Sequence, residues 1–115
     1  MQLTLKRYGK NHPMTFYTST YAKNGNLYVG LATHIEGYPA PWSDLTVNLS
    51  VKCQENCAFI DTNNNQDYSG NGDDIIDWLE SNGLGKRTGR MQISGFCVYP
   101  EFEFNMEKLK EYIEE

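Results

Sequence analysis

The chain has 115 residues and a formal net charge of −5, with 39% hydrophobic and 13% aromatic side chains. This length fits a single domain over residues 1–115 that can bury its own core, and the aromatic content exceeds that of disordered chains. The negative charge disfavours direct binding to DNA, RNA or an anionic membrane.

The first third of the chain predicts strands joined by turns. Residues 3–5 alternate apolar and polar side chains, as in a half-buried strand, and residues 10–13 predict a turn. Residues 14–22 are rich in Thr, Tyr and Phe, which favour strands. The Asn-Gly pair at 24–25 then predicts a tight hairpin, and the alternating residues 27–31 predict its return strand.

The middle of the chain predicts two further strands between loops. Residues 36–42 contain one Gly and two Pro and predict a loop, whereas residues 45–51 alternate and predict a half-buried strand. The apolar run 57–60 predicts another strand. Residues 61–72 consist mainly of Asn, Asp, Ser and Gly, and loops of this length in compact domains are often functional.

A first helix is predicted over residues 73–81, because its apolar side chains recur at helical spacing. Asn71 or Gly72 is the expected cap at its N-terminus, where the early aspartates also favour the positive end of the helix dipole. Gly83 or Gly85 is expected to end it.

The last third predicts one strand and a second helix. Residues 86–90 predict a basic turn, and residues 91–99 predict a strand that Pro100 ends. A helix is expected over residues 106–114 with Asn105 as its N-cap. Neighbouring strands joined by short turns pair antiparallel, so we expect an α+β fold with a sheet of five to six strands and two late helices packed on it.

Charge is distributed unevenly along the chain. Residues 61–82 carry six carboxylates and no basic side chain, whereas residues 1–30 carry four basic side chains and no acid. This predicts an acidic surface, which selects basic partners and repels nucleic acid. The alternative interpretation is a solvated face that maintains solubility. The residues expected to bind a protein partner are Asp61, Asp67, Asp73, Asp74, Asp77 and Glu80.

The segment 61–67 has oxygen ligands at alternate positions, as at the start of a calcium loop. The remainder departs from that pattern, because Gln66 replaces the required glycine and Gly72 replaces the bidentate glutamate. We therefore favour a turn whose Asx side chains bind the local backbone.

Cys53 and Cys57 could bind zinc together with His12 or His34, but a second close Cys/His pair is missing. Neither histidine lies in a recognisable nucleophile motif, and the glycines near residue 84 are too closely spaced for a phosphate loop. We predict a non-enzymatic protein without metal or cofactor. The alternative is a small metal-dependent enzyme that uses Asp61, Asp67 and His34.

The absence of an apolar run of 18 residues predicts no transmembrane helix. The N-terminus lacks the apolar region of a signal peptide, and three cysteines, an odd number, fit a reduced protein. We expect a cytoplasmic location.

Four segments together resemble a family of small uncharacterised proteins classed as a domain of unknown function. They are TVNL at 46–49, IDTNN at 60–64, residues 76–83 and SGFCVYP at 94–100, and the resemblance extends over residues 14–110. The family is associated with bacterial phages, plasmids and integrative elements. The resemblance implies an accessory protein of a mobile element, and such elements carry short acidic inhibitors of host defence, including anti-CRISPR and anti-restriction proteins.

Charge and resemblance together lead to one expected function. We expect an inhibitor in the bacterial cytoplasm that binds a basic surface of a host defence nuclease, with a CRISPR effector as the first choice. Acidic side chains would imitate the phosphate backbone and block nucleic-acid binding. The alternative is a scaffold or regulatory accessory protein of the element with no defence role.

Overall fold

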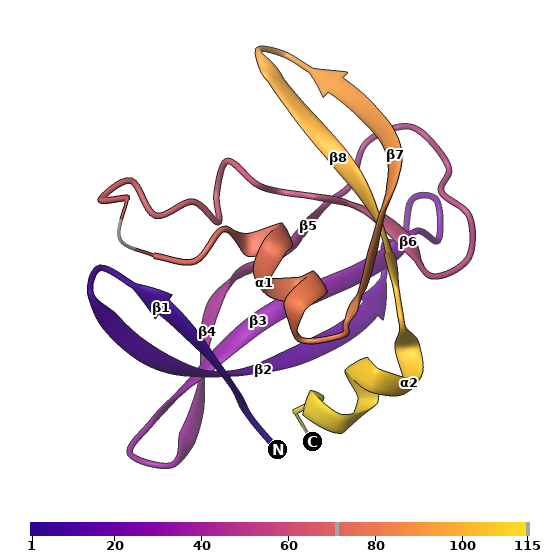
Figure 1. Ribbon diagram of the computed structural model, residues 1–115. Coiled ribbons are helices and arrows are strands. Elements are labelled where there is room, and N and C mark those ends of the chain that lie inside the picture. The colour runs from indigo at the N-terminus through magenta and orange to yellow at the C-terminus, as the bar shows by residue number, and fades with distance from the viewer. Residues whose placement is uncertain (71, 115) are drawn as a thin grey trace.

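The computed structural model describes residues 1–70 and 72–114, and this part of the chain forms two four-stranded antiparallel sheets (Figure 1). The first sheet has the order β1 (Leu3–Arg7), β2 (Lys10–Thr20), β3 (Leu27–Ile35) and β4 (Tyr38–Asp44). The second has the order β5 (Thr46–Val47), β6 (Cys57–Ile60), β8 (Cys97–Phe104) and β7 (Gly85–Ser94).

The helices are shorter than the sequence suggests. They are α1 (Ile75–Ser81), α2 (Met106–Leu109) and the 3-10 turn η1 (Lys110–Tyr112). The expected helix over 106–114 begins at its predicted cap, since the Asn105 side chain accepts a hydrogen bond from the Lys108 N–H. Its last residues instead become extended, and Ile113 forms a parallel bridge with Phe16 of β2.

The expectation of an α+β fold with one sheet of five to six strands is therefore wrong. The protein is mainly β, because segments assigned to turns and loops lengthen the strands. Residues 86–90, expected to form a basic turn, belong to β7, and residues 36–42, expected to form a loop, supply most of β4. In contrast, residues 45–51 yield only the two-residue strand β5.

Prolines account for several of these differences. All four prolines of the chain lie in strands, at positions where the strand has a paired neighbour on one side only. Pro39 and Pro41 lie in the edge strand β4, Pro13 precedes the first residue of β2 that pairs with β3, and Pro100 lies outside the part of β8 that pairs with β6. A missing N–H is tolerated there, since that side of the strand needs no ladder hydrogen bond.

The hairpin turns use residues with positive φ. Tyr8 and Gly9 join β1 to β2 with φ of 53° and 76°, and Glu36 and Gly37 join β3 to β4 with φ of 53° and 84°. Positive φ at both central residues is the type I′ arrangement, which matches the twist of the paired strands. The turn expected at 10–13 is therefore two residues too late. Gly95, with φ of 61°, turns the chain inside the segment 91–99 that was expected to be one strand.

The hairpin predicted from Asn24-Gly25 is confirmed as β2–β3, although its connection is wider than a two-residue turn. Asn26 is buried there and attaches the loop to the segment between β5 and β6. Its side-chain amide donates to the Val51 carbonyl at 2.9 Å and its side-chain oxygen accepts from the Cys53 N–H at 3.0 Å.

One hydrophobic core joins the two sheets and both helices. It contains apolar side chains from β1, β2 and β3 on one side and from β6 and β8 on the other, with α1 inserted beside them. The buried set includes Leu5, Phe16, Leu31, Ile60, Ile76, Trp78, Leu79, Phe102, Phe104 and Leu109. The opposite face of the second sheet covers a smaller cluster around Cys53, Cys57 and Phe59. Within the described residues, no helix is long and apolar enough to cross a membrane.

Strands β7 and β8 continue well beyond the body of the protein as a two-stranded arm (Figure 1). We define the β7–β8 arm as residues 91–100. Strand β6 pairs only with residues 101–103 of β8, so the two strands of the arm pair with each other alone.

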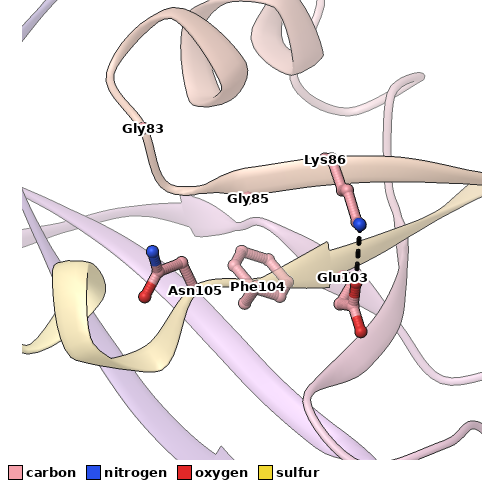
Figure 2. A pocket seen from close by; sticks show the side chains of 6 residues that line it. All are labelled: Gly83, Gly85, Lys86, Glu103, Phe104 and Asn105. Carbon is pink, nitrogen blue, oxygen red and sulfur yellow. Dashed lines mark ion pairs between the residues drawn. The ribbon is translucent and has the colours of Figure 1, made fainter.

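Gly85 lies at the base of β7, where the chain leaves α1, and borders a depression of about 320 Å³ (Figure 2). Its φ is 149°, and a Cβ atom at this position would lie 2.1 Å from the Glu103 carbonyl oxygen. The atom in the way belongs to the backbone, so it cannot move aside as the end of a flexible side chain could. Glycine at position 85 therefore allows β7 to lie this close to β8.

We expect Gly85→Ala to lower the free energy of unfolding by about 3 kcal/mol or more, because it adds a backbone clash to an unfavourable φ. Gly89→Ala is the matched control in the same strand, since Gly89 has φ of 90° and open space around its Cβ position. The control should cost only the strain, roughly 1–2 kcal/mol. Urea denaturation measures both, and equal losses would contradict the role of the contact.

Candidate functional site

The predicted binding residues lie on one loop and on the helix that follows it. We call residues 61–70 and 72–74 the acidic loop.

A buried arginine holds this loop against the first hairpin. Arg7 ends β1 on the same face as Leu3 and Leu5, and only 3% of it is exposed. Its guanidinium donates to the carbonyls of Asn65 in the first half of the loop and Asp73 near its end, and to the carbonyl of Lys6.

Asn65 forms the second anchor of the acidic loop. It is buried, and its side-chain amide donates to the carbonyls of Asp44 at 3.0 Å and Asp61 at 2.8 Å. Its side-chain oxygen accepts from the Ser43 hydroxyl at 2.6 Å. These contacts satisfy the buried amide and connect the acidic loop to β4.

Two carboxylates of the loop bind backbone N–H groups of the first hairpin. Asp67 Oδ2 accepts from the Tyr8 N–H at 2.8 Å, and Asp73 Oδ2 accepts from the Lys6 N–H at 2.9 Å. Asp67 also accepts from the hydroxyl and the N–H of Ser69, and the Ser69 hydroxyl makes the largest contribution to the lowered pKa of Asp67. Hydrogen bonds of this kind orient a carboxylate but do not neutralise its charge.

The N-cap of α1 is Asp74 and not the expected Gly72. The other expected cap, Asn71, lies outside the described residues. Asp74 Oδ1 accepts from the N–H groups of Ile76 and Asp77, both at 3.0 Å. The apolar side of the helix is buried in the core, where the Trp78 indole N–H donates to the Thr4 carbonyl at 2.8 Å. The carboxylates therefore point away from the core on a helix that is fixed on its other side.

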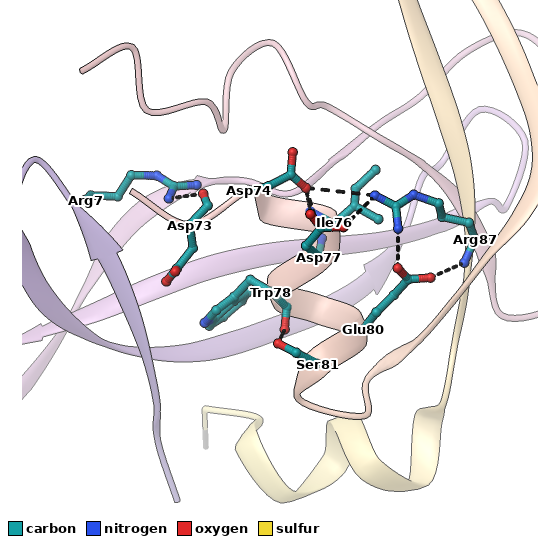
Figure 3. A network of polar contacts seen from close by, with 9 residues as sticks. All are labelled: Arg7, Asp73, Asp74, Ile76, Asp77, Trp78, Glu80, Ser81 and Arg87. Carbon is teal, nitrogen blue, oxygen red and sulfur yellow. Dashed lines mark hydrogen bonds and ion pairs between the residues drawn. The ribbon is translucent and has the colours of Figure 1, made fainter. Parts of the chain in front are cut away.

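Arg87 of β7 lies among the carboxylates of α1 (Figure 3). Its guanidinium forms an ion pair with Asp77 at 2.9 Å, contacts Glu80, and lies 4.0 Å from Asp74. The pKa of Arg87 is raised, mainly by the hydrogen bond to Asp77. Three carboxylates thus share one cation, which reduces the negative charge of this face without removing it.

The structure brings the predicted residues together in two groups that share Asp74. Asp67, Asp73 and Asp74 line a depression of about 330 Å³, whereas Asp74, Asp77 and Glu80 surround Arg87. Asp61 lies at the start of the loop, where its side chain accepts from the Asn64 N–H at 3.1 Å. Among the described residues, Arg87 is the one cation that forms ion pairs with these six carboxylates, and it reaches only Asp74, Asp77 and Glu80.

The residues of the metal and enzyme alternatives lie in separate environments. The His12 ring packs at a tilt of 46° against Trp42, and His34 contacts Glu114 at 2.9 Å, in neither case beside Asp61 or Asp67. No group of three or more His, Cys, Asp or Glu side chains that could hold a metal ion is found among residues 1–70 and 72–114.

The cysteines are suited to packing. Burial raises the pKa of Cys53 to about 11 and also raises the pKa of Cys57. Both therefore remain thiols near neutral pH in this environment, whereas nucleophilic attack requires a thiolate.

Three residues that organise the site were missed by the sequence interpretation. Arg7 carries a local signal, because it continues the inward-facing alternation of Leu3 and Leu5. Asn65 and Arg87 carry none that sequence spacing could reveal. The partners of Asn65 in β4 lie 21 and 22 residues away in the sequence. The carboxylates that Arg87 contacts lie seven to thirteen residues away, at the start of α1 and along it.

The chain matches the family model described as a domain of unknown function, DUF4313, over residues 15–115. It belongs to this family. The resemblance to an uncharacterised family is thus confirmed, over nearly the range expected. No curated protein and no solved structure gives a match.

We expect Arg7→Met to destabilise the protein by about 2–4 kcal/mol and to release the acidic loop, because three carbonyls lose their buried donor. Amide exchange should accelerate at Asp73, whose N–H donates to the Lys6 carbonyl. Lys6→Met is the control, since Lys6 is the exposed neighbour in the same strand. Unchanged exchange in the loop of Arg7→Met would contradict the anchoring role.

The lowered pKa of Asp67 predicts an acid-sensitive loop. Because the pKa is below 3.8 in the folded state, its stabilising effect is present above pH 3.8 and is lost as the pH falls through the folded value. Asp67→Asn keeps an acceptor for the Tyr8 N–H but cannot titrate. We expect this variant to lose less stability than the wild type between pH 5 and pH 2.5, measured by thermal unfolding. Parallel curves would contradict the assignment.

Proposed function

We propose that this protein is a non-enzymatic inhibitor that binds a basic nucleic-acid channel through the acidic loop and α1. The observation that carries the proposal is the fixed arrangement of these six carboxylates. Buried anchors hold the loop, a capped and packed helix holds the rest, and the described ion pairs to these carboxylates all come from one cation, Arg87. Carboxylates held in advance lose little entropy on binding and gain fast, salt-sensitive association with a basic partner.

Arg87 has a particular effect in this proposal. It lies between carboxylates of successive helical turns and so keeps them spaced and oriented. Each ion pair is exposed, and exposed pairs contribute little to stability. A partner's Lys or Arg can therefore join the cluster at small cost, whereas Asp67 and Asp73 make no ion pair with any described residue.

The proposed setting follows from the sequence resemblance. Proteins of mobile elements include inhibitors of host defence, and we propose that this chain acts in the bacterial cytoplasm on an RNA-guided nuclease. Such nucleases hold the guide–target duplex in a positively charged channel that recognises the backbone rather than the bases. A rigid acidic surface competes for the same groups.

A second candidate is a scaffold or regulatory accessory protein with no defence role. The β7–β8 arm favours it, because a projecting, partly apolar hairpin is suited to joining another protein. This function predicts a stable partner and no effect on nuclease activity.

The proposal is tested by competition on a purified Cas9-type nuclease with its guide and a fluorescent target duplex. The wild-type protein should raise the apparent Kd for DNA at least about tenfold at low salt, and NaCl at 300 mM should largely remove the effect. The variant Asp67→Asn/Asp73→Asn/Asp77→Asn should lose most of it, since the amides keep acceptor atoms but not charge.

The matched control is Glu36→Gln/Glu55→Gln, which removes exposed charge outside the acidic loop and α1. It should inhibit like the wild type, and circular dichroism should show both variants folded. The proposal is wrong if the triple variant inhibits as well as the control, or if the wild type leaves DNA binding and cleavage unchanged across RNA-guided nucleases of different classes.

A further inference from the structure

The two faces of the β7–β8 arm differ in a way that the sheet register defines. Directly paired residues share a face, and the register pairs Met91 with Pro100 and Ile93 with Val98. Along β8, this face continues to Phe102 and Phe104, which are buried in the main core. The core-facing side of the second sheet thus extends past the core and is left uncovered.

This uncovered face is apolar. The exposed fractions are 66% for Met91, 69% for Ile93 and 48% for Val98, and Phe96 at the tip is fully exposed. Four of the nine large exposed hydrophobic residues of the described chain lie within residues 91–98. The other face carries Gln92, Cys97 and Tyr99, each only partly exposed, and Tyr99 packs against the small cluster around Cys53. A solvated hairpin would show the reverse pattern, with its polar side chains outward.

The acidic face of α1 lies on the same side of the sheet. Arg87 pairs in register with Phe102, so its side chain belongs to the core-facing side, and there it reaches Asp77 and Glu80. The apolar arm and the acidic helix therefore border one another along β7. No charged residue lies between Met91 and Pro100, and the charged groups that follow on this face at the base of the arm are Arg87 and the carboxylates paired with it, Asp77 and Glu80.

Charge and backbone chemistry select among three occupants. A second copy of this chain would bring another negatively charged molecule against the acidic side, since the net charge is −5. A lipid surface would leave the outer backbone groups of edge strand β7 without partners, which is costly in hydrocarbon. A protein segment with one apolar and one basic face meets neither obstacle.

We propose that the apolar face of the β7–β8 arm, together with the acidic face of α1, binds a basic amphipathic helix of a partner protein. The size fits, because five strand residues and about twelve helical residues both extend roughly 17–18 Å. Apolar side chains of the helix contact Met91, Ile93 and Val98, and its Lys or Arg side chains face Asp77 and Glu80. That the partner is basic is inferred from the proposed function. That it binds through apolar side chains is inferred from the β7–β8 arm alone.

The test uses a fluorescein-labelled 14-residue Leu/Lys peptide with leucines at helical spacing, and a scrambled peptide of equal composition. By fluorescence anisotropy, the wild type should bind the amphipathic peptide at least about tenfold more tightly than the scrambled one. Ile93→Thr/Val98→Thr should remove that preference, because both substitutions suit a strand but reduce the apolar surface. The control Ile35→Thr/Tyr38→Thr removes exposed apolar groups from the β3–β4 tip and should bind like the wild type.

A third variant, Asp77→Asn/Glu80→Gln, separates this inference from the proposed function. Weaker peptide binding both with this variant and with Ile93→Thr/Val98→Thr supports the apolar contact and the basic contact alike. Loss of binding with Ile93→Thr/Val98→Thr alone supports the apolar contact with the arm and overturns the basic character of the partner. Unchanged binding with the arm variant overturns the inference, while the proposed function still stands if the acidic variant binds less.

Two further measurements test the other occupants. Sedimentation velocity at 100 µM should give a monomer, and a wild-type dimer that Ile93→Thr/Val98→Thr dissociates would overturn the inference in favour of a second copy. Flotation with phosphatidylserine vesicles should leave the protein unbound. Vesicle binding that the same variant abolishes would overturn it in favour of a lipid surface.

Discussion

The guanidinium of Arg7 connects the first hairpin to the acidic loop at two points, Asn65 and Asp73, and the position of the site depends on this connection. A buried arginine is costly unless its donors are satisfied, and here backbone carbonyls satisfy them instead of a carboxylate. The carboxylates of the loop are therefore left to face outward or to bind N–H groups of the same hairpin. Because Asp73 is held in this way, the adjacent Asp74 is placed to cap α1, and the helix begins where its apolar side meets the core.

Arg87 illustrates how a surface can be acidic and orderly at once. Three carboxylates at successive turns of one helix, each three residues from the next, repel, and this repulsion would favour scattered side-chain conformations. A shared cation from β7 offsets it and also attaches the helix to the edge of the second sheet. The same contact reduces the field available to a partner, so the unpaired carboxylates of the loop contribute more per group to attracting a basic surface. Charge counted along the sequence overstates the acidity of the folded face for this reason.

Local patterns predicted the elements that local forces determine. The β2–β3 hairpin follows from Asn-Gly between alternating segments, β6 from an apolar run, and the α2 cap from Asn105. The errors arise where neighbours decide. Pro39, Pro41 and Pro100 break central strands but are tolerated at free edges, and no local feature reveals which edge is free. The loop expected over 61–72 is present and extends to Asp74, whereas its anchor Asn65 and the cation Arg87 beside α1 depend on contacts across the fold.

The arm and the acidic face respond to different conditions, and this difference has a consequence for how they act together. Attraction between charges acts over about 10 Å at 0.1 M salt and weakens as salt rises, whereas apolar contact begins only when the surfaces meet and is little affected. An approaching basic helix is therefore oriented first by Asp77 and Glu80 and retained afterwards by Met91, Ile93 and Val98. Since the two sets are joined through Arg87 on a single strand, the orientation gained from the first set is already the one that the second requires.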